Sequence, residues 1–160
     1  MSKKKIVIVT GNINSGKSTY LLTTYEQLES KEKAVGFVAL PILKRNAKVG
    51  FELFILHENK KIKFASVEEN FGNFQLGKYR FDQKLFDEVI LNFPKIEPDS
   101  IVFLDEYGKL EAEGKGWYPL IEQVLRQDFE KCYLVVRKEL MGMMLDKLKV
   151  NKYELIEIRP

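Results

Sequence analysis

Short apolar runs and stretches of helical periodicity alternate along most of the chain. Residues 6–9 and 101–104 are consecutive apolar side chains, most of them β-branched, as in strands that are buried on both faces of a parallel sheet. Elsewhere, apolar residues three and four positions apart predict amphipathic helices, and further apolar runs predict strands. The helices are expected over 17–30, 82–93, 117–125 and 140–148, and the additional strands over 131–136 and 153–158. This pattern predicts an α/β fold with a mostly parallel central sheet flanked by helices.

Residues 34–67 depart from this alternation. Apolar runs at 34–43 and 49–56 are joined by the short polar stretch KRNAK, and a third run at 61–67 follows a second turn. Apolar runs that are joined in this way predict antiparallel pairing. We therefore expect a β-hairpin that continues as a meander after the first helix. Residues 68–81 contain two glycines and several aromatic residues without a sustained period, which predicts a long loop.

Composition adds three expectations. The 160 residues fit a single domain, 1–160, and the net charge of +3 comes from lysines interleaved with acidic residues, so a nucleic-acid partner is not expected. The start of the chain has no apolar segment long enough to cross a membrane, and we expect a cytoplasmic protein without a membrane partner. Cys132, the only cysteine, is expected to pack in the core, and His57, the only histidine, to lie in a surface turn.

The chemistry begins directly after the first apolar run, in the segment GNINSGKST. This segment matches the phosphate-loop pattern G-x-x-x-x-G-K-[ST], and it lies between a predicted strand and a predicted helix, as the pattern requires. Glycines at both ends allow backbone N–H groups to turn toward a phosphate, and the N-terminus of the following helix adds its dipole. The sequence therefore predicts a nucleotide-binding loop made of Gly11, Asn12, Ile13, Asn14, Ser15, Gly16, Lys17, Ser18 and Thr19.

Three side chains of this loop have predicted roles of their own. Lys17 is expected to contact the β- and γ-phosphates and so to contribute to catalysis, and the Ser18 hydroxyl is expected to ligate Mg²⁺. The Thr19 hydroxyl can contact the α-phosphate. Mg²⁺ is therefore the expected cofactor, and a nucleoside triphosphate is the expected partner.

A pair of acids follows the second buried run. Asp105 and Glu106 come directly after residues 101–104, which matches the Walker B pattern of an apolar strand that ends in an acid. Asp105 is expected to hold Mg²⁺ opposite the Ser18 hydroxyl. The neighbouring Glu106 can polarise a water molecule for in-line attack on the γ-phosphate, and this favours hydrolysis as the reaction.

Two other functions remain open from the residues alone. A small-molecule, nucleoside or nucleotide kinase uses the same phosphate loop, and its acceptor site would lie in the aromatic loop that carries Lys78, Tyr79 and Arg80. A GTPase-like switch is the other alternative, because 105–108 fit D-x-x-G. A guanine-reading N-K-x-D motif is missing, since residues 151–154 end in Glu. A requirement for an acceptor, or a strong preference for GTP over ATP, would separate these alternatives from hydrolysis.

Together these motifs resemble the small P-loop family of thermophilic nucleoside triphosphatases that includes the human cancer-related nucleoside triphosphatase. The resemblance rests on GNINSGKST at 11–19, KRNAKVGFEL at 44–53, LGKYRFD at 76–82 and LDEYGKLE at 104–111. It implies a RecA-like α/β domain that slowly hydrolyses ATP, GTP and related triphosphates with Mg²⁺ and with little base preference.

The resemblance also bears on single residues. Lys109 belongs to the family's signature near the site, which makes it a catalytic candidate. Arg45 matches a family arginine, and it can either reach the γ-phosphate or lie solvated on the hairpin. The chain departs from the family at Ile13 and Asn14, where Pro and Gly are usual, and from Arg137 onward.

Overall fold

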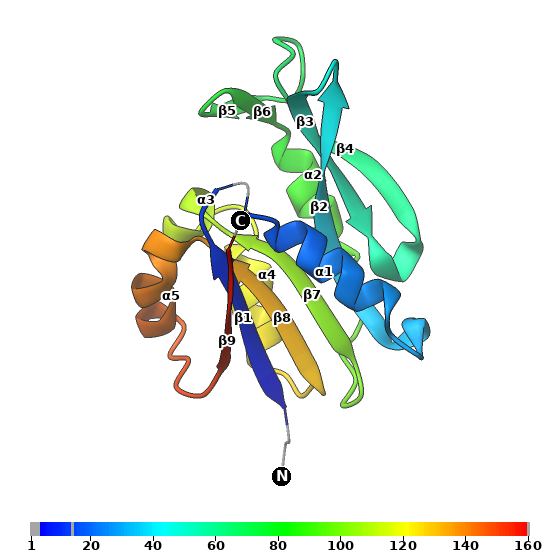
Figure 1. Ribbon diagram of the computed structural model, residues 1–160, viewed down its shortest axis with the longest axis vertical. Helices are drawn as coiled ribbons and strands as arrows, with labels where there is room; N and C mark the ends of the chain where they lie inside the picture. The colour runs from blue at the N-terminus through cyan, green and yellow to red at the C-terminus, as the bar shows by residue number, and fades with distance from the viewer. Residues whose placement is uncertain (1–3, 14, 160) are drawn as a thin grey trace.

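The computed structural model describes residues 4–13 and 15–159, and their strands form a nine-stranded sheet (Figure 1). The order across the sheet is β5-β6-β4-β3-β2-β7-β8-β1-β9. The strands are β1 Lys5–Gly11, β2 Ala34–Lys44, β3 Ala47–Ile55, β4 Lys60–Ser66, β5 Phe74–Leu76, β6 Tyr79–Phe81, β7 Ile101–Tyr107, β8 Lys131–Val136 and β9 Glu154–Ile158.

One half of the sheet is parallel and the other half is antiparallel. Strands β2, β7, β8, β1 and β9 pair in parallel, whereas β3, β4, β6 and β5 continue from β2 in antiparallel pairs. β2 belongs to both halves, because its residues 34–36 pair with β7 and its residues 37–44 pair with β3. In Figure 1 the antiparallel strands extend upward from the parallel ones. The predicted parallel sheet and the predicted meander after the first helix are both confirmed.

Helices cover both faces of the parallel strands (Figure 1). They are α1 Lys17–Glu26, α2 Gln83–Leu91, α3 Lys109–Ala112, α4 Tyr118–Leu125 and α5 Met141–Lys147, with short 3₁₀ turns η1 Lys31–Lys33, η2 Leu56–Glu58 and η3 Lys138–Leu140. On one face, Leu21 of α1 packs with Val7 and Phe103. On the other, α2, α4 and α5 contribute to a second cluster that contains Leu104 and Leu134. The sheet is thus buried between two layers, as its apolar runs predict.

The first helix ends earlier than the predicted range of 17–30. The N–H of Gln27 donates to the carbonyl of Thr23 at 3.1 Å, and the N–H of Leu28 then donates to the carbonyl of Tyr25 at 3.1 Å. The second bond spans only three residues, and this tighter closure ends the helix. Leu28 nevertheless packs against the same core cluster as Leu21, so the predicted apolar stripe faces the sheet.

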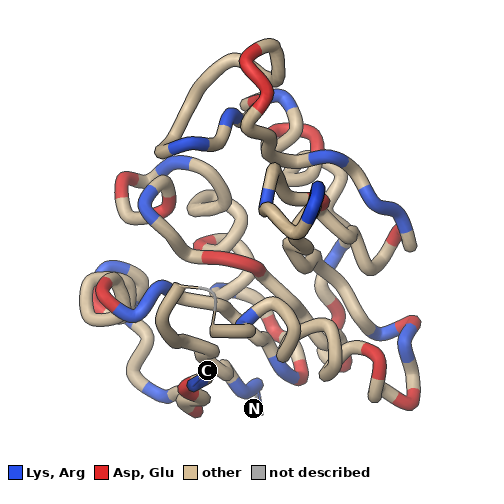
Figure 2. Tube along the Cα trace, turned by 45° about the horizontal axis from the view of Figure 1, so that its top comes forward, with Lys and Arg blue, Asp and Glu red and all other residues tan. Residues whose placement is uncertain are grey.

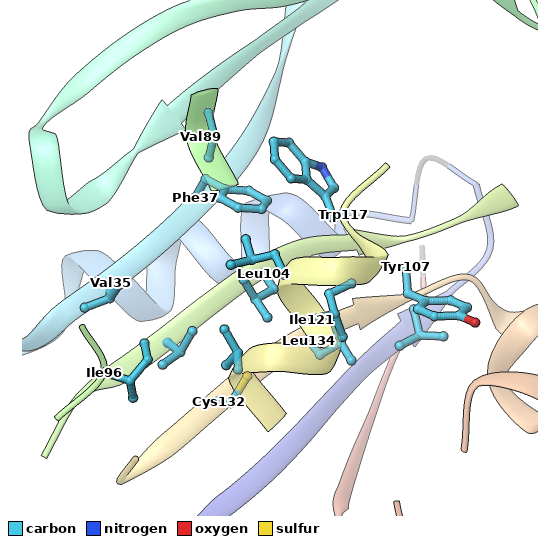
Figure 3. Packing of buried hydrophobic residues seen from close by; sticks show 14 of the residues in the cluster. Val35, Phe37, Val89, Ile96, Leu104, Tyr107, Trp117, Ile121, Cys132 and Leu134 are labelled. Carbon is cyan, nitrogen blue, oxygen red and sulfur yellow. The ribbon is translucent and has the colours of Figure 1, made fainter. Parts of the chain in front are cut away.

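An aromatic group joins the antiparallel strands to the helices behind the parallel sheet. Trp117 is 3% exposed, and its ring centroid lies 4.4 Å from that of Phe37 on β2 and 4.6 Å from that of Phe86 on α2. Figure 3 shows Trp117 and Phe37 beside Leu104 of β7 and Ile121 of α4. One hydrophobic cluster therefore packs against both halves of the sheet and joins them.

Turns and bends occupy 69–73, so residues 68–81 are only in part the loop that the sequence predicts. They contain the short strands β5 and β6, and β6 pairs with β4. Gly77, at φ 63°, begins the two-residue turn between them, which is a preferred glycine position in tight hairpins. Phe74 and Phe81 stack at 5.6 Å between ring centroids. Strands of three residues are too short to show a period, and this explains the error.

His57 is not a solvated turn residue as predicted. It lies in η2, where its Nδ1 accepts a hydrogen bond from the N–H of Gly36 at 3.1 Å. Its ring packs edge-on against Phe93, with the centroids 5.3 Å apart. Burial lowers the pKa of His57, and the charge of Glu58 opposes this effect. His57 therefore stabilises the start of β2.

The predicted N-cap of α2 is present and gives a stability prediction. The Asp82 carboxylate accepts a hydrogen bond from the N–H of Lys84 at 3.0 Å. Asp82→Ala should lower the free energy of unfolding by about 1 kcal/mol, measured by urea denaturation. Asp87→Ala, which removes an exposed acid and its 3.0 Å surface hydrogen bond from Gln83 in the same helix, is the control and should change the stability by less than about 0.5 kcal/mol. Equal stability of Asp82→Ala and the parent protein would show that the cap contributes nothing.

Cys132 packs in the core as predicted, and its thiol should be unreactive. The residue is 0% exposed, beside Leu134 on β8 (Figure 3). Burial raises the pKa of its thiol to about 12, so the nucleophilic thiolate is scarce at neutral pH. A thiol-specific chromogenic reagent should label the chain in urea and leave the native protein unlabelled over the same time. Rapid labelling of the native protein would contradict this packing.

Figure 2 shows lysines and arginines interspersed with acidic residues along the described chain. This arrangement agrees with the interleaving of lysines and acids in the sequence. Among the helices of the described residues, none combines the length and the apolar character that a membrane span requires.

Candidate active site

The phosphate loop leaves β1 at Gly11 and enters α1 at Lys17. Gly16, immediately before the helix, adopts the left-handed conformation at φ 96° and ψ 22°, which favours glycine. Gly11 is restricted by space instead, because a Cβ there would lie 2.5 Å from Ser15 Oγ and 2.6 Å from the carbonyl oxygen of Ile158. Both motif glycines are therefore required by the shape of the loop, and the end of β9 closes one side of it.

Polar groups of the loop are turned inward. Lys17 Nζ donates to the carbonyl of Gly11 at 3.1 Å and to that of Asn12 at 2.8 Å, so the ammonium group lies over the loop. The buried hydroxyls of Thr10 and Ser15 have no hydrogen-bond partner among the described residues. A buried polar group without a partner is costly, and these two are therefore suited to accept a ligand's hydrogen bonds or to donate to it.

The other loop residues are more open. Ile13 is 72% exposed, and Asn12 and Thr19 are exposed as well. Asn14, which the motif also includes, lies outside the described residues.

Asp105 lies against the start of α1. Its Oδ2 accepts a hydrogen bond from the Ser18 hydroxyl at 2.6 Å and another from the N–H of Ala39 on β2 at 3.0 Å. The residue is 5% exposed. Burial raises the pKa of Asp105 to about 7, and the neighbouring Glu106 acts in the same direction, whereas the Ser18 and Ala39 hydrogen bonds and Lys17 oppose the rise. A cation beside this carboxylate would favour its charged form.

Glu106 lies in an irregularity of β7. Asp105 pairs with Val135 of β8 and Tyr107 pairs with Val136, so Glu106 is an extra residue on its strand, as in a β-bulge. Its carboxylate Oε1 lies 3.6 Å from Arg137 Nε. Burial raises the pKa of Glu106, and the charges of Arg137 and Lys17 act against this rise. Because β7 runs parallel to β1, Glu106 lies at the same end of the sheet as the phosphate loop.

A third acid, Glu111, supports the segment after β7. It is 4% exposed, and its two carboxylate oxygens accept hydrogen bonds from the N–H of Gly108 at 2.9 Å and from the N–H of Trp117 at 2.7 Å. Burial raises the pKa of Glu111 to about 7, and these two N–H donors oppose the rise. Glu111 therefore fixes the turn that follows Glu106.

The donor atoms suit a magnesium ion that arrives with a nucleotide. Ser18 and Asp105 offer hard oxygen ligands beside the phosphate loop, and Mg²⁺ is commonly bound by one or two protein oxygens together with phosphate and water oxygens. In the described part of the chain, no three His, Cys, Asp or Glu side chains gather as a site made of protein alone.

The structure brings Lys17, Ser18, Asp105 and Glu106 together at one end of the parallel strands. Lys109 is exposed at the first residue of α3, and its predicted catalytic role stays a prediction. Sequence reasoning missed Arg137 and the role of Glu111, which it noted only within a motif. The position of Arg137 directly after a buried parallel strand was the available signal, since ligand-binding residues gather at the carboxyl ends of such strands.

Arg45, for which the sequence left open either a contact with the γ-phosphate or a solvated position, lies at the tip of the β2–β3 hairpin. It is exposed in the turn between β2 and β3, with φ 52° for Arg45 and 65° for Asn46. Two successive residues with positive φ form the tight turn that hairpins prefer. The placement favours a solvated side chain for Arg45.

A sequence model of a protein family described as NTPase matches residues 6–160. The chain belongs to this NTPase family. The predicted resemblance is therefore confirmed, and the chain is a nucleoside-triphosphate phosphohydrolase by family.

Individual relatives agree with the family assignment. Nucleoside-triphosphatase THEP1 of Archaeoglobus fulgidus is 26% identical over 143 residues, which cover 89% of this chain and 83% of the relative. The protein of the same name from Methanothermobacter thermautotrophicus is 26% identical over 141 residues, with 85% and 79% covered.

Solved structures share the fold of this NTPase-family chain. The crystal structure of THEP1 from the hyperthermophile Aquifex aeolicus superposes with a TM-score of 0.73 at 22% identity, covering 97% of this chain and 90% of the other. The solution structure of a human cancer-related nucleoside triphosphatase gives a TM-score of 0.71 at 16% identity, with 96% and 88% covered. The predicted P-loop α/β fold is thus confirmed.

Proposed function

We propose that this chain hydrolyses ATP, GTP and related nucleoside triphosphates to the diphosphate and phosphate with Mg²⁺, in the cytoplasm, and that Glu106 activates the attacking water. The observation that supports this most directly is the 2.6 Å contact between the Ser18 hydroxyl and Asp105, with the Glu106 carboxylate on the next residue. A metal-binding pair and a candidate base are thereby adjacent beside the phosphate loop. This is the arrangement that in-line attack by water needs.

The protein's own groups act by position and charge. The backbone N–H groups of the loop and the N-terminus of α1 attract the phosphates, and Lys17 is free to exchange its loop carbonyl partners for phosphate oxygens. Ser18 and Asp105 would hold Mg²⁺, which when bound neutralises charge on the terminal phosphates. Glu106 accepts a proton from the water that attacks the γ-phosphorus. Burial of Asp105 and Glu106 strengthens these charge interactions.

The function is tested by measuring phosphate release from several nucleoside triphosphates, with Mg²⁺ or with a chelator, and without any acceptor. We expect release that depends on Mg²⁺, needs no acceptor and differs little among bases. Transfer of the γ-phosphoryl group to a nucleoside or sugar, with no diphosphate formed when this acceptor is omitted, would identify a kinase and contradict the proposal. The β5–β6 hairpin, which carries Lys78, Tyr79 and Arg80, would then be the place to search for the acceptor site.

A further inference from the structure

Arg137 is fixed by its backbone beside Glu106. It is the first residue after β8, and its N–H donates to the carbonyl of Tyr107 on β7 at 3.1 Å. Its own carbonyl accepts a hydrogen bond from the N–H of Leu140 in η3 at 2.9 Å. Because both backbone groups are bonded, the main chain of Arg137 has a defined position relative to the residue that follows Glu106.

The guanidinium of Arg137 lies between two carboxylates. Its Nε is 3.6 Å from Glu106 Oε1, and its Nη1 is 3.9 Å from Glu139 Oε1. The Arg137 side chain is only 30% exposed, and that of Glu106 33%. A planar guanidinium offers donors in fixed directions, so it restrains a carboxylate more than a flexible ammonium group does. A phosphate oxygen would have to displace one of these carboxylates to reach the same donors.

We propose that Arg137 is a positioning residue, which holds one oxygen of the Glu106 carboxylate so that the other oxygen faces the attacking water. This inference rests on the proposed hydrolytic role of Glu106. Restraint of this kind matters for rate, because a small displacement of a catalytic group from its productive geometry lowers turnover strongly. It does not alter how the phosphate loop binds the nucleotide, so its loss should change kcat and leave KM nearly unchanged.

The test is a double-mutant cycle of Arg137→Gln and Glu106→Gln, with kcat and KM for acceptor-free hydrolysis measured in each variant. Arg137→Gln alone should lower kcat by about tenfold or more, with KM changed by less than about threefold. In the Glu106→Gln background, Arg137→Gln should have no further effect, because the residue acts through Glu106. Arg137→Lys should recover part of the lost rate. Lys138→Gln, which removes the neighbouring cation that pairs with Glu157, should match the parent protein.

Each contrary result has a distinct meaning. An equal loss of rate from Arg137→Gln in both backgrounds would show that Arg137 acts on the phosphate independently, and it would overturn the inference. A raised KM at unchanged kcat would do the same, by assigning Arg137 to nucleotide binding. Full turnover in the single variant Glu106→Gln would instead remove Glu106 from its proposed role, and loss of acceptor-free hydrolysis in the parent protein would overturn the proposed function. If Arg137→Gln does not fold, Arg137→Lys replaces it in the cycle, and additivity there contradicts the inference.

Discussion

Glu106→Gln is expected to lower kcat for phosphate release by about 10²-fold or more, with little change in the Kd for the triphosphate. The substitution keeps the size of the side chain and one oxygen near Arg137, but it removes the group that accepts the proton of water. The phosphate loop, Lys17 and the Ser18–Asp105 pair remain in place, so binding should persist. Turnover is measured by phosphate release, and binding by titration of the nucleotide at equilibrium.

Glu113→Gln is the matched control for this variant. Glu113 is an exposed acid beside α3, and its carboxylate lies 3.7 Å from Lys115 Nζ in a surface ion pair. Such pairs contribute little, and this variant should keep the turnover of the parent protein. Turnover in Glu106→Gln that equals the turnover in Glu113→Gln would remove Glu106 from the catalytic role.

Asp105→Asn is expected to have two opposite effects, which are a large loss of activity and a gain in stability. An amide is a poor ligand for Mg²⁺ in place of a carboxylate, and kcat should fall by about 10²-fold or more. Both hydrogen bonds to Asp105, from Ser18 and from Ala39, go to the single atom Oδ2. The oxygen of an asparagine side chain can accept both, so the substitution removes a buried charge and keeps the bonds.

The gain in stability should depend on pH in a defined direction. Burial raises the pKa of Asp105 in the folded protein from 3.8 to about 7. The neutral, protonated Asp105 contributes its full stability to the fold below pH 3.8, the pKa in the unfolded chain. This contribution is lost as the pH rises toward about 7, the pKa in the folded protein. In a chelator at about pH 8, Asp105→Asn should therefore be more stable than the parent protein by roughly 2–4 kcal/mol, since one pKa unit corresponds to 1.4 kcal/mol.

Urea denaturation at several pH values measures this difference. The difference in the free energy of unfolding between the two proteins should nearly vanish as the pH falls to about 4. At that pH Asp105 is protonated in the folded parent protein, so it is as uncharged as the asparagine that replaces it. A gap of the same size at both ends of the range would show that the charge of Asp105 is not its cause. Lower stability of Asp105→Asn throughout would mean that the Ser18 and Ala39 bonds require the carboxylate.

The parts of the site that sequence analysis predicted are those encoded within one segment. The phosphate loop is contiguous from Gly11 to Thr19, and its glycine spacing is dictated by its own backbone conformation. Asp105 and Glu106 follow a buried strand, and the end of such a strand can be read from an apolar run. The contact of Ser18 with Asp105 is possible because β1 and β7, which are separated by β8, are parallel strands whose carboxyl ends lie at the same edge of the sheet.

The parts of the site and fold that sequence analysis missed depend on contacts between segments that are distant in the sequence. Arg137 reaches Glu106 only because β8 lies beside β7 in a register with a bulge, and neither the strand order nor the bulge is visible in the sequence. Glu111 has the sequence context of a solvated helix acid, yet the return of the chain at Trp117 buries it. β5 and β6 were missed because three residues cannot show a period.

The central claim is that water attacks the γ-phosphorus of the bound triphosphate. It is tested most directly by a single turnover of ATP with Mg²⁺ in heavy-oxygen water, followed by mass spectrometry of both products. Attack by water at the γ-phosphorus predicts that the heavy oxygen appears in the released phosphate and not in the diphosphate. Heavy oxygen in the diphosphate, or a phosphate without it, would contradict the claim.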